Sequence, residues 1–178
     1  MARTTRDHDA GEEPGAAVLV STLYERQLAV AHWLLQAAER GIRRAVWEER
    51  GLIMLECGTL FSVVRIPAAF VEGAARSSDP HEIDGYLAEA LDGGPVVVDR
   101  ISQRYYALVP GSAARHWDVA GTVCLGRNSC LGVPYPDRTA PRVGRPYWSV
   151  PMDSAGDLCV PGLVARVIEA GRPRGALA

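Results

Sequence analysis

The stretch 91–111, LDGGPVVVDRISQRYYALVPG, constrains the fold of this chain most strongly. It contains two runs rich in β-branched and aromatic residues, 95–99 and 104–109, which are separated by the polar segment 100–103. Such runs are typical of β-strands, and the Gly-Gly-Pro and Pro-Gly sequences at their outer ends are typical of turns. We therefore predict a β-hairpin here, with the rest of a sheet built around it.

Helices and further strands are predicted on both sides of the hairpin. The clearest helix begins where Asp79 or Ser78 caps the chain and Pro80 takes the first helical position, and it ends before Gly93. Other elements follow from apolar periodicity and from glycine and proline positions. The predicted strands are 51–57, 59–67, 119–125, 130–133 and 147–150, and the predicted helices are 21–40, 68–75, 80–91 and 163–170.

Three details of this assignment bear on the topology. We predict that the first helix stops at Gly41, although 42–50 could continue it past a tolerated glycine. The runs 51–57 and 59–67 are two strands or one long bent strand. The runs 119–125 and 130–133 are predicted to pair with each other around the turn GRNS.

The chain length of 178 residues fits one domain with a sizeable core. Residues 1–17 are charged and rich in glycine and proline, and we expect them to be disordered. We predict that residues 18–171 form a single α+β domain, mainly an antiparallel sheet with flanking helices. Residues 172–178 are then a flexible C-terminal tail.

Charge restricts the ligands and the chemistry. The formal net charge of -2 gives no bulk basic footprint for nucleic-acid binding. All 19 basic residues are arginine, so the chain has neither the lysine of a Schiff base nor that of a P-loop. Arginine binds phosphate groups with its planar fork, so a local arginine patch stays compatible with a phosphorylated ligand.

Localisation and redox state follow from similar considerations. No apolar run approaches the roughly 20 residues that span a bilayer, and residues 1–15 are polar, so we expect a cytoplasmic protein without membrane contact. The cysteines are then expected to be reduced. They form no CxxC motif and have no histidine at a metal-ligand spacing, so no metal or other cofactor is predicted. The four cysteines are Cys57, Cys124, Cys130 and Cys159.

Catalytic signatures are missing from the predicted strands. Acid–base and metal-dependent catalysis need clustered carboxylates or a histidine near one. Glu56 is the only acid in 51–71, and there is none in 119–136. No GxSxG nucleophile elbow is present, and we interpret the run His116–Asp118 as part of a loop. The sequence therefore favours a protein without catalytic activity.

Arginines and aromatic residues indicate a binding function more clearly than the acids and histidines indicate catalysis. Basic residues interleaved with aromatic residues on a sheet can hold phosphates and stack bases. The alternative is that edge strands carry arginine and tyrosine for solubility and packing. Three more arginines, Arg138, Arg142 and Arg145, occupy the proline-rich loop before residue 147. The candidate nucleotide- or nucleic-acid-binding residues are Arg65, Arg104, Tyr106, Arg127 and Trp148.

Three stretches together resemble a known family. They are LLQAAERG (34–41), RYYALVPG (104–111) and LGRNSCLGVPYPD (125–137), with Tyr147-Trp148 at a plausible distance after them. They are similar to the bifunctional DNA primase/polymerase (Prim-Pol) domain of the archaeo-eukaryotic primase superfamily, in its divergent form. The resemblance covers roughly residues 26–150 and implies a Prim-Pol-like α+β fold.

The resemblance also implies where catalytic residues should lie, and this chain departs from that pattern. The family's paired metal-binding acids should fall on 61–66, which offers Ser62, Val64, Arg65 and Ile66. The family's nucleotide-phosphate histidine falls on Arg104, which can contact a phosphate but cannot act as a neutral imidazole. The resemblance therefore implies a degenerate member without polymerase activity.

Three functional hypotheses follow. The first is a non-catalytic, Prim-Pol-like domain that keeps contact with DNA or nucleotides. The second is a protein-interaction module without a nucleic-acid role, which docks a partner through its sheet or through the proline-rich loop 134–146. The third is an active nucleotidyltransferase, which would need Mg²⁺ or Mn²⁺ and acids from unexpected places such as Glu56 and Asp99.

Overall fold

The computed structural model describes residues 22–173, and the predictions for the tail 1–17 and for 174–178 lie outside that range. It is an α+β fold with helices around an antiparallel sheet, as predicted. The helices are α1 (Leu23–Leu34), η1 (Leu35–Ala37), α2 (Arg44–Arg50), α3 (Ala68–Ala75), α4 (Pro80–Ala90), η2 (Gly111–Arg115) and α5 (Pro161–Gly171). The strands are β1 (Leu52–Glu56), β2 (Phe61–Pro67), β3 (Val96–Asp99), β4 (Arg104–Pro110), β5 (Val123–Leu125), β6 (Cys130–Pro134) and β7 (Tyr147–Val150).

The predicted hairpin is the centre of the main sheet. Five strands follow the order β5-β2-β4-β3-β7, and every neighbouring pair is antiparallel. Strand β4 is the middle strand, and it pairs with β2 over seven residues and with β3 over four. The prediction that a sheet is built around this hairpin is confirmed.

Strand pairing differs from the sequence-based prediction at one point. The strands β5 and β6 do not pair with each other: β5 lies at the edge of the main sheet beside β2, and β6 pairs with β1 in a separate two-stranded sheet. The runs predicted at 51–57 and 59–67 are two strands, and they also lie in different sheets. Residues 126–129 therefore lead the chain from one sheet to the other instead of closing a hairpin.

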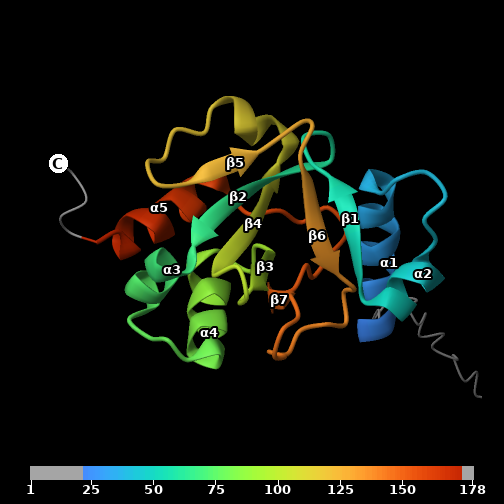
Figure 1. Ribbon diagram of the computed structural model, residues 1–178, viewed down its shortest axis with the longest axis horizontal. Helices are drawn as coiled ribbons and strands as arrows, with labels where there is room; N and C mark the ends of the chain where they lie inside the picture. The colour runs from blue at the N-terminus through green and yellow to red at the C-terminus, as the bar shows by residue number, and fades with distance from the viewer. Residues whose placement is uncertain (1–21, 174–178) are drawn as a thin grey trace, which may run out of the picture.

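Two hydrophobic clusters lie on opposite faces of the main sheet. Residues of α3, α4 and α5, such as Val71, Leu87 and Ile168, pack on one face. Residues of α1, α2 and the two-stranded sheet, such as Leu34 and Trp47, pack on the other face. Figure 1 shows this arrangement, with α3, α4 and α5 on one side and α1, α2, β1 and β6 on the other.

Local capping explains where the helices begin. Thr22 and Glu25 form a capping box at the start of α1, one residue after the predicted cap. Asp79 caps α4 by accepting hydrogen bonds from the backbone amides of residues 81 and 82, as its sequence predicts. The first helix ends earlier than predicted, because Ala38 is extended and forms a β-bridge with Leu55.

No helix within residues 22–173 has the length and apolar character needed to cross a membrane.

Candidate functional site

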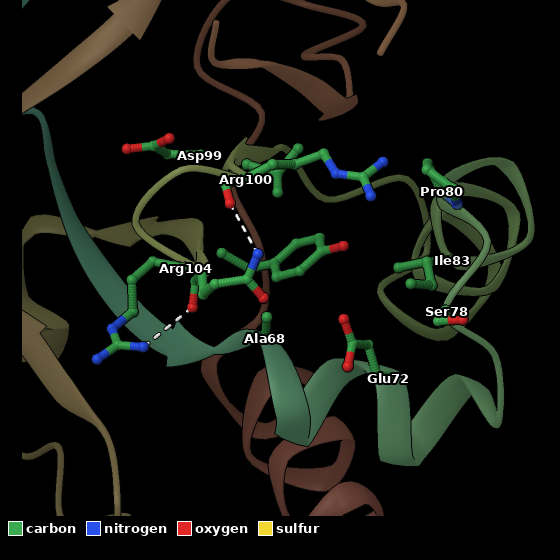
Figure 2. Close-up of a pocket in the computed structure, with 11 residues that line it drawn as sticks. Ala68, Glu72, Ser78, Pro80, Ile83, Asp99, Arg100 and Arg104 are labelled. Carbon is green, nitrogen blue, oxygen red and sulfur yellow. Dashed lines mark hydrogen bonds between the residues drawn. The ribbon is translucent and has the colours of Figure 1, made fainter. Parts of the chain in front are cut away.

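Three of the five predicted site residues lie together on one face of the main sheet. Arg65 of β2 is directly opposite Tyr106 of β4, and Arg104 lies two residues before Tyr106 on the same face. Arg65 is exposed, and the other two are half-buried. The Arg104 guanidinium contacts the backbone oxygen of Gln103, and Figure 2 shows it pointing away from Glu72.

Trp148 does not belong to this group, which corrects the sequence-based prediction. It is only 1% exposed and lies in the core beneath the two-stranded sheet. Its indole Nε1 donates a hydrogen bond to the Pro134 oxygen at 3.0 Å. A tryptophan that is buried and already paired presents no ring face to a ligand, so its role is to hold the fold.

Arg127 also lies away from the group on the sheet. It follows β5, and its backbone packs so closely against Gly58 that a Cβ on that glycine would overlap the Arg127 nitrogen. Gly58 precedes Phe61, the end of β2 that pairs with Pro110, whereas Arg104 pairs with the opposite end of β2. Arg65 pairs with Val123, so Arg127 lies further along the sheet from Arg65 and almost the length of β2 from Arg104.

The positions where the family resemblance places catalytic acids are core positions. Ser62 is buried and donates a hydrogen bond to the Gly111 oxygen at 2.9 Å, and Val64 and Ile66 are buried as well. No group of three or more His, Cys, Asp or Glu residues within 22–173 is placed to hold a metal ion.

The two acids named for an active enzyme lie in different parts of the structure. Glu56 is in the two-stranded sheet, opposite Cys130. Asp99 ends β3 in the main sheet, and its carboxylate accepts hydrogen bonds from the backbone amides of Ile101 and Ser102. Asp99 therefore stabilises the hairpin turn. The two acids lie in different sheets and do not form a common site.

A cavity beside the loop between β6 and β7 brings four arginines together. This arginine hollow has a volume of about 300 Å³ and no acidic residue in its lining. Arg50 comes from the end of α2, and the other three come from the loop itself. The lining consists of Arg50, Gly51, Leu52, Arg138, Ala140, Arg142, Gly144, Arg145, Pro146 and Tyr147.

A second hollow adjoins the first. Its volume is about 440 Å³, and it lies between the hairpin turn after β3 and the tip of the same loop. It shares Arg142 and Gly144 with the arginine hollow. It adds a fifth arginine, Arg100, and the exposed apolar side chains of Ile101 and Val143. The two hollows therefore form one continuous basic surface over the loop.

Few carboxylates neutralise these arginines. Three ion pairs occur within residues 22–173, and Arg138, paired with Asp137 at 3.2 Å, is the only arginine of either hollow among them. Arg142 and Arg145 are exposed. The protein has a formal net charge of -2, so the positive charge at this loop is a local feature of the surface.

Buried tryptophans hold the loop at both ends. The Trp148 backbone amide donates a hydrogen bond to the Arg138 oxygen at 2.8 Å, and the Trp47 indole donates to the Val133 oxygen at 3.0 Å. The Tyr135 amide donates to the Gly51 oxygen at 3.0 Å. These bonds fix the backbone at both ends of the loop and at Arg138.

A half-buried carboxylate supports the same region from the other face of the sheet. Asp84 of α4 accepts hydrogen bonds from the hydroxyl groups of Tyr147 and Ser149 on β7. Burial raises the pKa of Asp84, and these hydrogen bonds oppose that effect. Tyr147 is also part of the wall of the arginine hollow, so Asp84 positions that wall.

A further cavity beside the hairpin turn is too small for a ligand. It lies between α3, α4 and the hairpin turn, and Figure 2 shows Glu72, Arg100 and Ile83 around it. Its volume of about 20 Å³ is enough for a water molecule. Burial, with the nearby Asp84 carboxylate, raises the pKa of Tyr105 in its wall to about 12, so that phenol stays protonated at neutral pH.

Sequence reasoning found the loop arginines but not the site they form. Arg138, Arg142 and Arg145 stand out as a run of basic residues in a proline-rich loop. Arg50 and Arg100 carry no comparable signal, because each lies in a separate stretch far from the loop in sequence. Only the packing of α2 and the hairpin turn beside the loop brings all five together.

No family model, curated protein or solved structure matches this chain.

Proposed function

We propose that this domain binds phosphorylated ligands, nucleic acid or nucleotides, through the arginine hollow and without catalysis. The observation that carries the proposal is the convergence of four arginines on one cavity whose lining contains no acid. The proposal keeps the sequence-based prediction of a nucleic-acid or nucleotide ligand. It moves the centre of binding from the sheet to the loop between β6 and β7.

Arginine chemistry favours a phosphate group over other ligands here. A guanidinium presents a planar fork of N–H donors that matches the oxygens of a phosphate and stays charged at any physiological pH. Arg142 and Arg145 are exposed and outside the ion pairs of the described residues, so a ligand need not displace a carboxylate from them. Charge-assisted hydrogen bonds of this kind are among the strongest that proteins form.

The residues on the sheet face are proposed as secondary contacts. Arg65, Tyr106 and Arg104 lie side by side on one face of the main sheet, where Arg65 is exposed and the other two are half-buried. An aromatic ring near arginines can stack a base while the arginines hold neighbouring phosphates. In this proposal they extend the binding surface, and the arginine hollow supplies most of the affinity.

A protein partner is the second candidate, and one observation favours it. Ile101 in the hairpin turn is 72% exposed and Val143 in the loop is fully exposed, so the basic surface also displays apolar side chains. An acidic protein segment with an apolar residue would complement such a surface. This candidate keeps the prediction that the loop 134–146 docks a partner.

The test is binding of a labelled oligothymidine and of nucleoside triphosphates, measured by fluorescence anisotropy and calorimetry. The informative variant carries Arg142→Glu and Arg145→Glu. We expect this change to weaken binding by at least about 25-fold, since each lost arginine contact contributes about fivefold. The matched control carries Arg115→Glu and Arg166→Glu, which changes the net charge equally at exposed positions on η2 and α5.

The control separates a specific site from a change in overall charge. If both double variants lose affinity equally, the hollow is not the binding site. If the wild-type protein binds neither ligand at low salt, the proposal is wrong. Binding of polyglutamate in that case would support the protein-partner candidate.

A further inference from the structure

We infer that the ligand is a single-stranded nucleic acid whose backbone runs across both hollows, and that a mononucleotide occupies only part of the site. This inference rests on the proposed function. It adds the class of ligand, the path that the ligand takes over the loop, and the residue at which the two hollows meet. That residue is Arg142, which lines both cavities.

The distribution of charge points to more than one phosphate. The arginine hollow and the second hollow are separate cavities of about 300 and 440 Å³ that meet at Arg142 and Gly144. Arg50 and Arg145 line the first and not the second. Arg100 lines the second and not the first, and it also lines the small cavity beside α4. A single phosphate group satisfies the arginines of one cavity. Consecutive phosphates of a strand would reach both, with Arg142 between them.

The second hollow has the composition expected for the sugar and base of a strand. Its lining alternates charge with apolar surface: Arg100 and Arg142 stand beside Ile101, Pro141 and Val143. Exposed apolar side chains next to guanidinium groups suit a nucleotide, which carries its charge on the phosphate and presents apolar ring faces elsewhere. A free nucleoside triphosphate offers the apolar faces of one base only.

The shape of the surface favours a single strand over a duplex. Both hollows are concave, and their volumes are those of small-ligand pockets. A duplex is a wide convex body whose bases are stacked inside it, so it contacts the rim and leaves the hollows empty. A flexible single strand enters both hollows and turns its bases toward Ile101 and Val143.

The experiment compares ligands of increasing length on variants of each hollow. Dissociation constants are measured for a nucleoside triphosphate, a series of oligothymidines and a duplex. The variants are Arg50→Ala, which changes the first hollow and leaves the second intact, and Arg100→Ala, which changes the second and leaves the first intact. Arg166→Ala on α5 is the control for loss of an exposed arginine. Far-UV circular dichroism and thermal unfolding verify that each variant is folded.

Affinity is expected to rise with length beyond one nucleotide and then to level off. Arg100→Ala should weaken oligothymidine binding about fivefold and leave triphosphate binding unchanged, whereas Arg50→Ala should weaken both. Arg166→Ala should change neither.

Two results would overturn the inference and leave the proposed function intact. The first is a triphosphate that binds as tightly as every oligothymidine, with Arg100→Ala affecting neither. The second is a duplex that binds as tightly as the single strand. Absence of binding to all these ligands would instead overturn the proposed function itself.

Discussion

The contact between α3 and α5 offers a sharp test of the packing in this fold. Gly171 is buried at the end of α5, where the two helices touch through glycines. A Cβ at Gly171 would overlap the backbone oxygen of Phe70 and lie 2.7 Å from the backbone nitrogen of Ala74. Both atoms belong to the backbone of α3, so no side-chain rotation can relieve the overlap. The substitution Gly171→Ala must push the helices apart.

The size of the effect follows from known costs of overpacking. Extra methyl groups in a packed core cost about 1–3 kcal/mol, and a clash with backbone belongs at the upper end, so we expect a loss of about 2–3 kcal/mol in the free energy of unfolding. For a domain of this size that loss lowers the melting temperature by about 4–12 °C. The separated helices also lose apolar contacts around Val71 and Ile168, which adds to the loss.

Gly85→Ala is the matched control. Gly85 lies within α4, and nothing is within 4 Å of a Cβ built there. Alanine is a better helix former than glycine, so this variant should gain about 0.5–1 kcal/mol. Urea denaturation followed by circular dichroism measures both variants. Equal effects of the same sign, or an unchanged stability of Gly171→Ala, would refute the packing described for α3 and α5.

Two further predictions concern titratable groups. Cys130 is exposed, whereas burial raises the pKa of Cys57 to about 12. At about pH 8 only about one Cys57 thiol in ten thousand is then a thiolate, which is the reactive form. Iodoacetamide at this pH should therefore alkylate Cys130 first. Comparable labelling rates by mass spectrometry would contradict the burial of Cys57. Burial also raises the pKa of Asp84, so the folded state holds this proton more tightly than the unfolded state and stability falls as the pH rises from 3.8 through the raised pKa. Across that window the stability of Asp84→Asn, measured by urea titrations at several pH values, should therefore rise relative to that of the wild type. A difference in the free energy of unfolding that stays constant with pH would contradict a raised pKa of Asp84.

Patterns of a few neighbouring residues were enough to predict the central hairpin and the helix α4. The hairpin around 100–103 follows from β-branched runs and turn residues, and α4 follows from Asp79 and Pro80. These features act over a few residues, so the sequence shows them directly.

Partners that are distant in sequence were harder to predict. The strands β5 and β6 are close in sequence, yet they pair with β2 and β1, because strand pairing is decided by which surfaces the whole fold buries. Trp148 is buried because it belongs to a cluster that also contains Trp47 of α2 and Val133 of β6, which are distant from it in sequence. Arg50 and Arg100 join the loop arginines only through packing between separate elements.

The salt dependence of oligothymidine binding tests the central claim most directly. If five arginines contact phosphates, the logarithm of the binding constant should fall with the logarithm of the salt concentration with a slope of about −3.5, which is about 0.7 for each contact. Reversal of charge at Arg142 and Arg145 should reduce the steepness by at least about 1.4, and the same reversal at Arg115 and Arg166 should leave it nearly unchanged. A slope near zero, or one that the loop variant does not alter, would contradict the account.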